Sequence, residues 1–235
     1  MILKKILNMV LFPNTYSNEA YISWLRKNGA TIGENTRFIA PKECHVDINR
    51  AMYIQIGNNC CLSYPTILAH DYSWYIFKDA MDDILPDPGG KVIIGNNCFI
   101  GYKAIILKDT TIGDNVIIGA GAVVKGNVPS NTVWAGIPAR QICTLEELYE
   151  KKKRTRIDDC IKRAKTLQDH STLTQENMEF FGLMFLERTE DNYDKYIRKL
   201  SFNGIIEDIG IRNYFFKTRP FWDGWNDFLN KNELD

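Results

Sequence analysis

The sequence predicts a mainly β protein whose central part is a coil of short parallel strands, with helical segments at both ends. Two observations predict this class. Aliphatic residues recur at every sixth position over residues 94–124, a period too short for a helical repeat unit and different from the 3.6-residue period of a helix. After residue 142 the six-residue rhythm gives way to helical spacing.

The six-residue repeat is regular, and each unit combines an aliphatic first residue with a small or β-branched fifth residue. We expect the first residues to point inward and stack, and the fifth residues to fill the narrow space beside them. Cys60 and Cys98 occupy fifth positions, so both are expected to be small core residues. The first residues are Ile94, Ile100, Ile106, Ile112, Ile118 and Val124, and the fifth residues are Cys98, Ala104, Thr110, Val116, Ala122 and Val128.

Four short strings look like copies of one corner of the coil: IGEN at 32, IGNN at 56 and 94, and IGDN at 112. Glycine and asparagine tolerate the left-handed backbone that a sharp corner needs. The strings at 94 and 112 are eighteen residues apart, which is three repeats, so we expect a three-sided coil. The longer separations upstream indicate extra residues around 44–53 and an insertion at about 74–93.

The repeat stops beside a histidine. Units beginning at Ile56, Leu62 and Leu68 keep the period, with Cys60 and Thr66 as fifth residues, and the next regular unit begins at Ile94. With Leu68 pointing inward, His70 is expected to point outward, where its imidazole can exchange a proton at neutral pH.

The insertion at 74–93 combines aromatic and acidic residues, which suits recognition of a sugar face and its hydroxyl groups. Insertions longer than about 12–15 residues without structure of their own are often functional. The alternative is a loop that packs its own aromatic residues and exposes its acids. The candidate substrate-binding residues are Trp74, Tyr75, Asp82 and Asp83.

Residues 94–124, followed by VPSNTVWAGIPARQI at 128–142, resemble the hexapeptide-repeat acyltransferase family. The segments HVDINRAMYIQIGNNC (45–60) and LAHDYSW (68–74) resemble its polysaccharide and sugar O-acetyltransferase branch. The resemblance covers roughly residues 20–145 and implies a left-handed parallel β-helix. It also implies acetyl transfer from acetyl-coenzyme A to a hydroxyl of a saccharide destined for surface or capsular polysaccharide, and a homotrimer with sites between subunits.

The resemblance implies that His70 is the general base of this reaction. Asp71 is its neighbour in sequence and could orient the ring. Because adjacent side chains usually diverge, a carboxylate or carbonyl from elsewhere is the alternative.

The resemblance also implies a coenzyme site along the coil. Small residues would let the pantetheine arm approach the backbone, and two basic residues could pair with the phosphates. Lys125 could instead be a solvated lysine, and the basic run at 151–156 is interpreted as a solvated helix face, with phosphate steering as the alternative. The candidate coenzyme-binding residues are Gly101, Gly119, Ala120, Gly121, Lys125 and Arg140.

Three segments are predicted: an N-terminal helical segment at 1–30, the β-helix at 31–143, and a helical region at 144–235. Residues 1–13 are interpreted as an amphipathic helix rather than a signal peptide, because the apolar run is short. Thr144 and Glu147 have the spacing of a capping box. Helical stretches are expected at 178–188 and 191–200, and Trp222 and Trp225 are expected to be core residues.

The composition excludes several functional classes. Hydrophobic residues make up 45% of the 235 residues, which is typical of a globular protein, and the equal totals of 29 basic and 29 acidic residues give no nucleic-acid footprint. No run approaches the ~20 apolar residues of a membrane span. The six cysteines form no C-x-x-C pair, which favours reduced thiols and a cytoplasmic location.

Other functions remain open from the sequence. The acceptor could be a small molecule such as an antibiotic or a nucleotide-linked amino sugar, or the chain could be a non-catalytic scaffold that kept the coil. A zinc site of three histidines is not expected, because His45, His70 and His170 belong to dissimilar segments.

Overall fold

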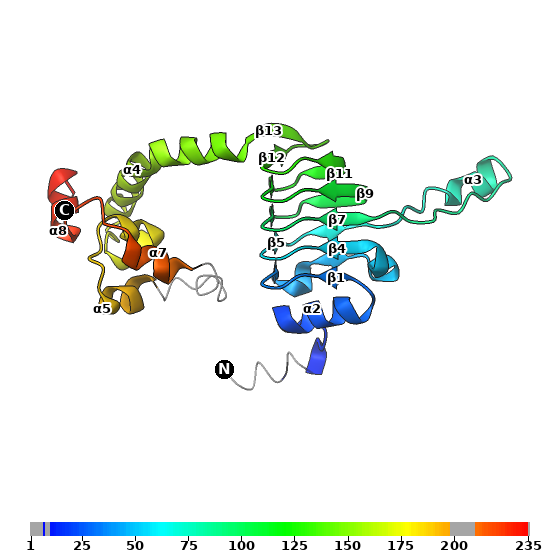
Figure 1. Ribbon diagram of the computed structural model, residues 1–235, viewed down its shortest axis with the longest axis horizontal. Coiled ribbons are helices and arrows are strands. Elements are labelled where there is room, and N and C mark those ends of the chain that lie inside the picture. Colours follow the sequence, from blue (N-terminus) through cyan, green and yellow to red (C-terminus); the bar gives the residue numbers. More distant parts are fainter. Residues whose placement is uncertain (1–6, 8–9, 198–209, 235) are drawn as a thin grey trace. The chain divides into compact units, whose positions relative to one another are not determined.

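The computed structural model describes residue 7 and residues 10–197 and 210–234. The chain divides into two compact units, residues 1–149 and 150–235. The first contains the strands and the second is helical (Figure 1). The helix expected at 1–13 falls largely outside the described residues.

Strand pairing builds the first unit as a coil with three sides. Each side is a column of strands, and every pairing within a column is parallel. The first column contains β1 (Thr31–Ile32), β4 (Ile54–Ile56), β7 (Val92–Ile94) and the second halves of β9 (Ile105–Ile112) and β11 (Val123–Val128). The second column contains β2 (Arg37–Ile39), β5 (Cys61–Ser63), β8 (Phe99–Ile100), β10 (Ile117–Ile118) and β12 (Thr132–Ala135). The third column contains β3 (His45–Val46), β6 (Thr66–Ile67) and the first halves of β9 and β11.

The register confirms the eighteen-residue coil over the regular run. Ile94 pairs with Ile112, and Ile100 pairs with Ile118. Every first residue and every fifth residue of the run is buried, Cys98 included, and so is Cys60 upstream. The run ends earlier than predicted, because Val128 takes the inward place above Ile112 after an irregularity in β11.

Asparagine, rather than glycine, supplies the left-handed backbone at the repeated corner. Each corner asparagine has a positive φ, and Asn115 is hydrogen-bonded to Asn97 at 2.8 Å and to Asn131 at 2.9 Å. This side-chain ladder links successive coils along one edge. The corner asparagines are Asn35, Asn59, Asn97, Asn115 and Asn131.

The corner glycines have a different role from the one predicted. None of Gly33, Gly57, Gly95 and Gly113 has a positive φ. A Cβ on Gly33 would lie 2.5 Å from the carbonyl carbon of Gly57 in the next coil, and the others are equally crowded. Glycine is therefore required because stacked coils approach too closely for a side chain.

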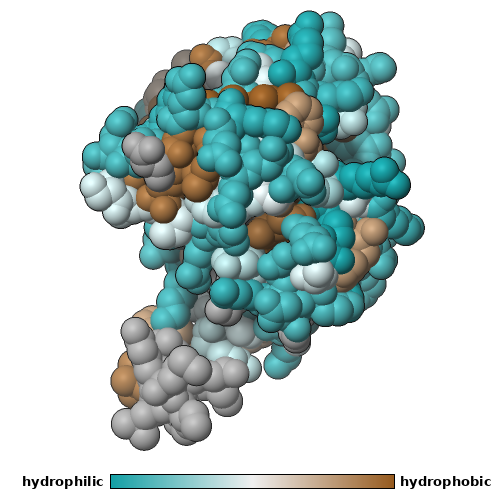
Figure 2. All heavy atoms as spheres, turned by 90° about the vertical axis from the view of Figure 1, so that its left-hand side faces the viewer, coloured by the Kyte–Doolittle hydropathy of each residue, from teal (hydrophilic) through white to brown (hydrophobic). Residues whose placement is uncertain are grey.

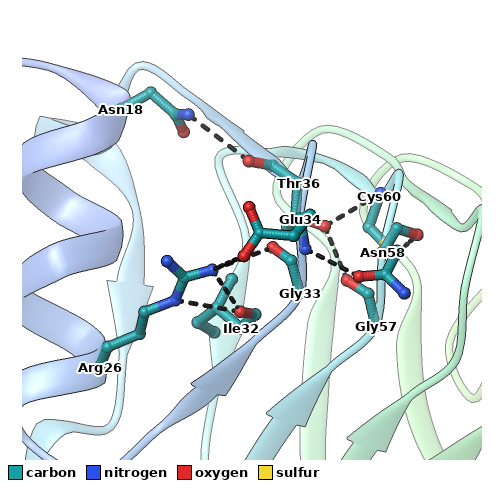
Figure 3. Close-up of polar contacts among 9 residues, drawn as sticks. All are labelled: Asn18, Arg26, Ile32, Gly33, Glu34, Thr36, Gly57, Asn58 and Cys60. Atoms are coloured by element: carbon teal, nitrogen blue, oxygen red, sulfur yellow. Dashed lines mark hydrogen bonds and ion pairs between the residues drawn. The ribbon is translucent and has the colours of Figure 1, made fainter.

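Helix α2 (Asn18–Lys27) covers the first coil. Its Tyr21 and Leu25 are buried against the core. Arg26 donates from Nε and Nη2 to the carbonyl oxygen of Ile32, at 3.0 and 2.6 Å (Figure 3). An open end of a stacked coil needs such a cap, because its apolar face and strand groups would otherwise meet water.

The extra residues predicted upstream form two irregular features. The 3-10 helices η1 (Pro41–Glu43) and η2 (Ile48–Tyr53) take up the surplus of the first coil. The insertion forms an arm that projects from the coil and carries α3 (Tyr75–Ala80) near its tip (Figure 1).

The coil ends in β13 (Arg140–Thr144), which pairs antiparallel with β12. The predicted capping box starts α4 (Leu145–Asp169): the Glu147 carboxylate accepts from the Thr144 N–H at 2.7 Å, and the Glu147 N–H donates to the Thr144 hydroxyl at 3.1 Å.

The helical unit has an apolar core of its own. Trp222 and Trp225 pack against Phe228, with ring centroids 4.8 and 5.4 Å apart, which confirms their prediction as core residues. Residues 198–200 of the helix predicted at 191–200 fall outside the described part of the chain. The further elements are η3 (Glu176–Met184), α5 (Glu190–Asn192), the π-helical turn η4 (Tyr193–Ile197), α7 (Ile211–Lys217) and α8 (Trp225–Lys231).

Candidate active site

The coil that carries His70 changes register by one residue. Ile67, not Leu68, takes the inward position and pairs with Ile106, so the prediction that Leu68 points inward is wrong. The reason is the corner at Tyr64, which turns with a φ of 52° and leaves only five residues from the inward Leu62 to Ile67. Alternation from Ile67 then buries Ala69 and turns His70 outward, where its side chain is 19% exposed.

A buried carboxylate holds the imidazole of His70. Asp47 follows β3 in the coil below, and its side chain is only 2% exposed. Its Oδ2 contacts His70 Nδ1 and also accepts a hydrogen bond from the N–H of Ala69 at 3.1 Å. A proton on Nδ1, facing a carboxylate, leaves Nε2 as the free acceptor of the ring. Of the two alternatives drawn from the sequence, the group from elsewhere makes this contact.

Asp71 makes other contacts. Its Oδ1 accepts from the N–H of Ser73 at 2.7 Å, and this bond holds the pKa of Asp71 below its usual value. Its own N–H donates to Oδ2 of Asp87 at 2.6 Å. Asp71 therefore shapes the turn that follows His70.

His70 lines an open pocket of about 420 Å³ on the outer surface of the coil. Leu68, Leu107 and Lys125 stack at equivalent positions on three successive coils and form one wall. The Tyr72 ring lies 4.3 Å from the His70 ring. The lining residues are Leu68, His70, Asp71, Tyr72, Leu107, Lys108 and Lys125.

The base of the arm is tied down beside this pocket. Asp87, on the segment of the arm that returns to the coil, contacts Lys108 Nζ through its other oxygen. This ion pair lowers the pKa of Asp87 and raises that of Lys108. Gly90 donates from its N–H to the carbonyl oxygen of Ala69 at 2.9 Å. The two ends of the insertion are thus held together at His70, which fixes the pocket wall.

The predicted substrate-binding residues lie on the arm and not in the pocket lining. Tyr75 is 61% exposed, and Asp82 and Asp83 are exposed too. Trp74 is half-buried and packs edge-on against Tyr75, with ring centroids 6.3 Å apart. Tyr72 and Lys108 line the pocket instead, and both were missed in the sequence.

The predicted coenzyme-binding residues fall into four groups, of which Arg140 is the last. Lys125 lines the His70 pocket. Gly101 and Gly119 are confined by stacking, since a Cβ on either would lie within 2.8 Å of the neighbouring coil. Ala120 and Gly121 are exposed at a corner, and a Cβ on Gly121 would meet open space.

Arg140 is exposed on β13, where its Nη1 donates to the carbonyl oxygen of Ala139 at 2.8 Å.

Two further findings concern metals and membranes. Within the described residues, no three His, Cys, Asp or Glu side chains come together as a group that could hold a metal ion. His45 is exposed on β3, and His170 is exposed after α4 in the helical unit. Every described helix is too short or too polar to cross a bilayer.

Comparison with known proteins identifies the class. The model of the family described as bacterial transferase hexapeptide (six repeats) matches residues 91–126. The putative acetyltransferase YvoF of Bacillus subtilis (strain 168) is 32% identical over 142 residues, which cover 59% of this chain and 72% of that relative. The chain therefore belongs to the bacterial hexapeptide transferase family, as its motifs indicated.

Other similar proteins carry names that specify O-acetyl transfer. The putative lipopolysaccharide biosynthesis O-acetyl transferase WbbJ of Escherichia coli (strain K12) is 31% identical over 42% of this chain and 57% of its own length. Among solved structures, a maltose O-acetyltransferase from Clostridium difficile 630 is 29% identical, with a TM-score of 0.38, over 54% of this chain and 75% of that one.

Proposed function

We propose that the protein is an acetyl-coenzyme A-dependent O-acetyltransferase acting on a saccharide hydroxyl, with His70 as its general base. The observation that carries the proposal is the contact of His70 Nδ1 with the buried carboxylate of Asp47 at an open pocket. A relative named as a putative lipopolysaccharide biosynthesis O-acetyl transferase supports the reaction and the acceptor class.

The proposed reaction uses both ring nitrogens of His70. Asp47 holds Nδ1 in its protonated form, so Nε2 accepts the proton of the acceptor hydroxyl as its oxygen attacks the thioester carbonyl. The tetrahedral intermediate then collapses, the C–S bond breaks, and the departing thiolate takes the proton from Nε2. Asp47 stabilises the transient imidazolium and, in place of Asp71, is the orienting residue.

For the coenzyme, we propose a path that ends at the His70 pocket. Lys125 lines that pocket, and Arg140 is exposed with guanidinium donors available for a phosphate. Gly121 and Ala120 offer an open corner along which a narrow pantetheine chain can lie. Gly101 and Gly119 contribute indirectly, by letting the coils stack beneath this path.

For the acceptor, we propose that Tyr72 forms the sugar-facing wall and that the arm closes over the bound saccharide. Trp74, Tyr75, Asp82 and Asp83 would then meet the sugar from the arm rather than from the pocket floor. Aromatic faces and carboxylates are suited to sugar C–H groups and hydroxyls respectively.

We also propose a left-handed coil that assembles as a homotrimer in the cytoplasm. Large apolar side chains remain exposed on the coil, among them Phe99 at 44% and Ile142 at 63%, and a homo-oligomer would bury such positions. All six cysteines are free thiols, which suits a reducing compartment. Light scattering of the purified protein tests the trimer, and a monomer mass at micromolar concentration would refute it.

The test of function is acetyl transfer by the purified full-length protein. Acetyl-coenzyme A would be incubated with a panel of saccharides, antibiotics and amino-sugar nucleotides, with free thiol measured and products identified by mass spectrometry. We expect O-acetylated saccharide. An acetylated amino-sugar nucleotide or antibiotic would show that the acceptor is not a saccharide of the proposed class. If calorimetry detects no coenzyme A binding, the protein is a non-catalytic scaffold.

A further inference from the structure

The helical unit contains a pocket of about 360 Å³ that the proposed acetyl transfer does not use. A volume of this order can hold a small organic ligand. The pocket is formed within residues 150–235 alone. Its lining residues are Arg156, Phe180, Phe181, Leu183, Met184, Arg188, Tyr214, Thr218, Arg219, Pro220 and Phe221.

The lining combines apolar walls with positive charge. Most of the wall is aromatic or aliphatic, three residues are arginines, and no lining residue is an aspartate or a glutamate. Figure 2 shows apolar side chains gathered into patches between hydrophilic ones on the face that it presents. An apolar pocket lined by three arginines and no acidic residue is complementary to a ligand that has an apolar body and an anionic group.

Arg188 contributes a fixed positive charge to this wall. It donates to the carbonyl oxygens of Leu183, Leu186 and Thr218, at 2.5, 2.5 and 3.1 Å, and stacks over the Phe215 ring at 4.7 Å. Carbonyl oxygens satisfy its donors without neutralising its charge. Desolvation lowers the pKa of Arg188, as expected for a cation in a poorly solvated wall without an acidic partner.

Arg156 and Arg219 supply the charges that a ligand can reach. Both are exposed, and among the described residues no ion pair links either one to a carboxylate. Arg156 belongs to the basic run at 151–156, and it is the residue of that run that reaches the pocket. A guanidinium presents parallel N–H groups that match the oxygens of a phosphate, so two of them can hold one dianion.

We propose that this pocket binds an amphiphilic phosphate, with its apolar chain on the Phe180, Leu183 and Phe221 walls and its phosphate between Arg156 and Arg219. The site is separate from the His70 chemistry, and the proposal does not rest on that chemistry. It gives the helical unit a ligand of its own.

The probe is geranyl phosphate, which pairs a short apolar chain with one phosphate, titrated into the full-length protein by calorimetry. Two matched probes test the apolar chain and the phosphate separately. Geraniol has the chain without the charge, and inorganic phosphate has the charge without the chain. We expect each of these to bind at least tenfold more weakly than geranyl phosphate.

The variant Arg156→Ala/Arg219→Ala removes both exposed charges and is expected to weaken geranyl phosphate binding at least tenfold. The matched control is Arg154→Ala, an exposed arginine on the same helix that does not line the pocket, and its affinity should equal that of the parent. His70→Ala should also bind geranyl phosphate unchanged, because every lining residue of the pocket belongs to the helical unit. Three results would overturn the proposal. The double variant could bind geranyl phosphate as tightly as the parent, Arg154→Ala could weaken binding as much as the double variant does, or the parent could fail to bind geranyl phosphate.

Discussion

The regular coils and the coil that carries His70 differ in how closely they follow the repeat. In the regular run, Ile94, Ile100 and Ile106 are each repeated one coil later at the same inward position. At His70 the register has shortened by a residue, and the insertion replaces the next corner. The backbone there is held by Asp47, by Asp87 and by the N–H of Gly90. The repeat thus provides rigidity, and its interruption provides the polar pocket.

The largest effect is expected at the interruption. His70→Ala removes the proposed general base, which should lower turnover by ~10²–10⁴-fold. Because the side chain points outward, the free energy of unfolding should change by less than ~1 kcal/mol. Release of coenzyme A in the presence of an active acceptor measures the turnover. His45→Ala, an exposed histidine on β3, is the control; turnover of His70→Ala within twofold of the parent would place the base elsewhere.

In the regular run, the expected loss is in stability and not in chemistry. Ile112 is 1% exposed and has inward neighbours in the coils on either side. Ile112→Ala should lower the free energy of unfolding by ~2–5 kcal/mol through lost burial and a residual cavity. Urea denaturation of the protein measures it, with Ile76→Ala, a 64% exposed residue of α3 on the arm, as control, expected within ~0.5 kcal/mol. Equal losses in the two variants would contradict the stacked core.

The proposed coenzyme path includes Arg140, which is exposed on β13. Arg140→Ala should weaken coenzyme A binding by ~1.5–3 kcal/mol, which is the usual worth of a charge-assisted hydrogen bond. Calorimetry measures the affinity. Arg140→Lys retains the charge without the fork, so it should recover part of the loss. Unchanged affinity in Arg140→Ala would remove this residue from the site.

The smallest effect is expected at the base of the arm. Lys108→Met removes the ion pair with Asp87, and a pair near the surface contributes ~0–1 kcal/mol. The pKa of Asp87 is lowered in the folded state, so its contribution is present above the usual carboxyl pKa and is lost as the pH falls below about 4. Thermal unfolding of parent and variant should therefore differ more at pH 7 than at pH 3. An equal difference at both pH values would indicate that Lys108 acts by packing alone.

The regular coils could be predicted from the sequence because each inward position repeats at a fixed interval. The eighteen-residue period placed Ile94, Ile112 and the buried Cys98 correctly. The same reasoning failed at Leu68, because a five-residue side looks like a six-residue side when both Ile67 and Leu68 are aliphatic. His70 was still found, because its side chain is expected to point outward in the predicted register and does so in the observed one.

The contact of Asp47 with His70 could not be predicted in this way, because the first coil is irregular and its register against the next coil does not follow from the repeat. His45 pairs with Thr66, twenty-one residues later, an interval that no repeat in the sequence indicates. Once that register is known, Asp47 lies beside Ala69 and His70. A lone acidic residue directly after a buried strand residue, Val46, is the signal that the sequence did contain.

The central claim is that Asp47 and His70 act as one catalytic unit at the interruption. A double-mutant cycle on turnover tests it most directly. Asp47→Asn alone should lose ~1.5–3 kcal/mol of transition-state stabilisation, about 10–100-fold in rate, while keeping an acceptor for the Ala69 N–H. In the His70→Ala background the same change should have no further effect, because the ring that Asp47 orients is absent. If the two losses add in full, Asp47 acts independently of His70 and the proposed unit is contradicted.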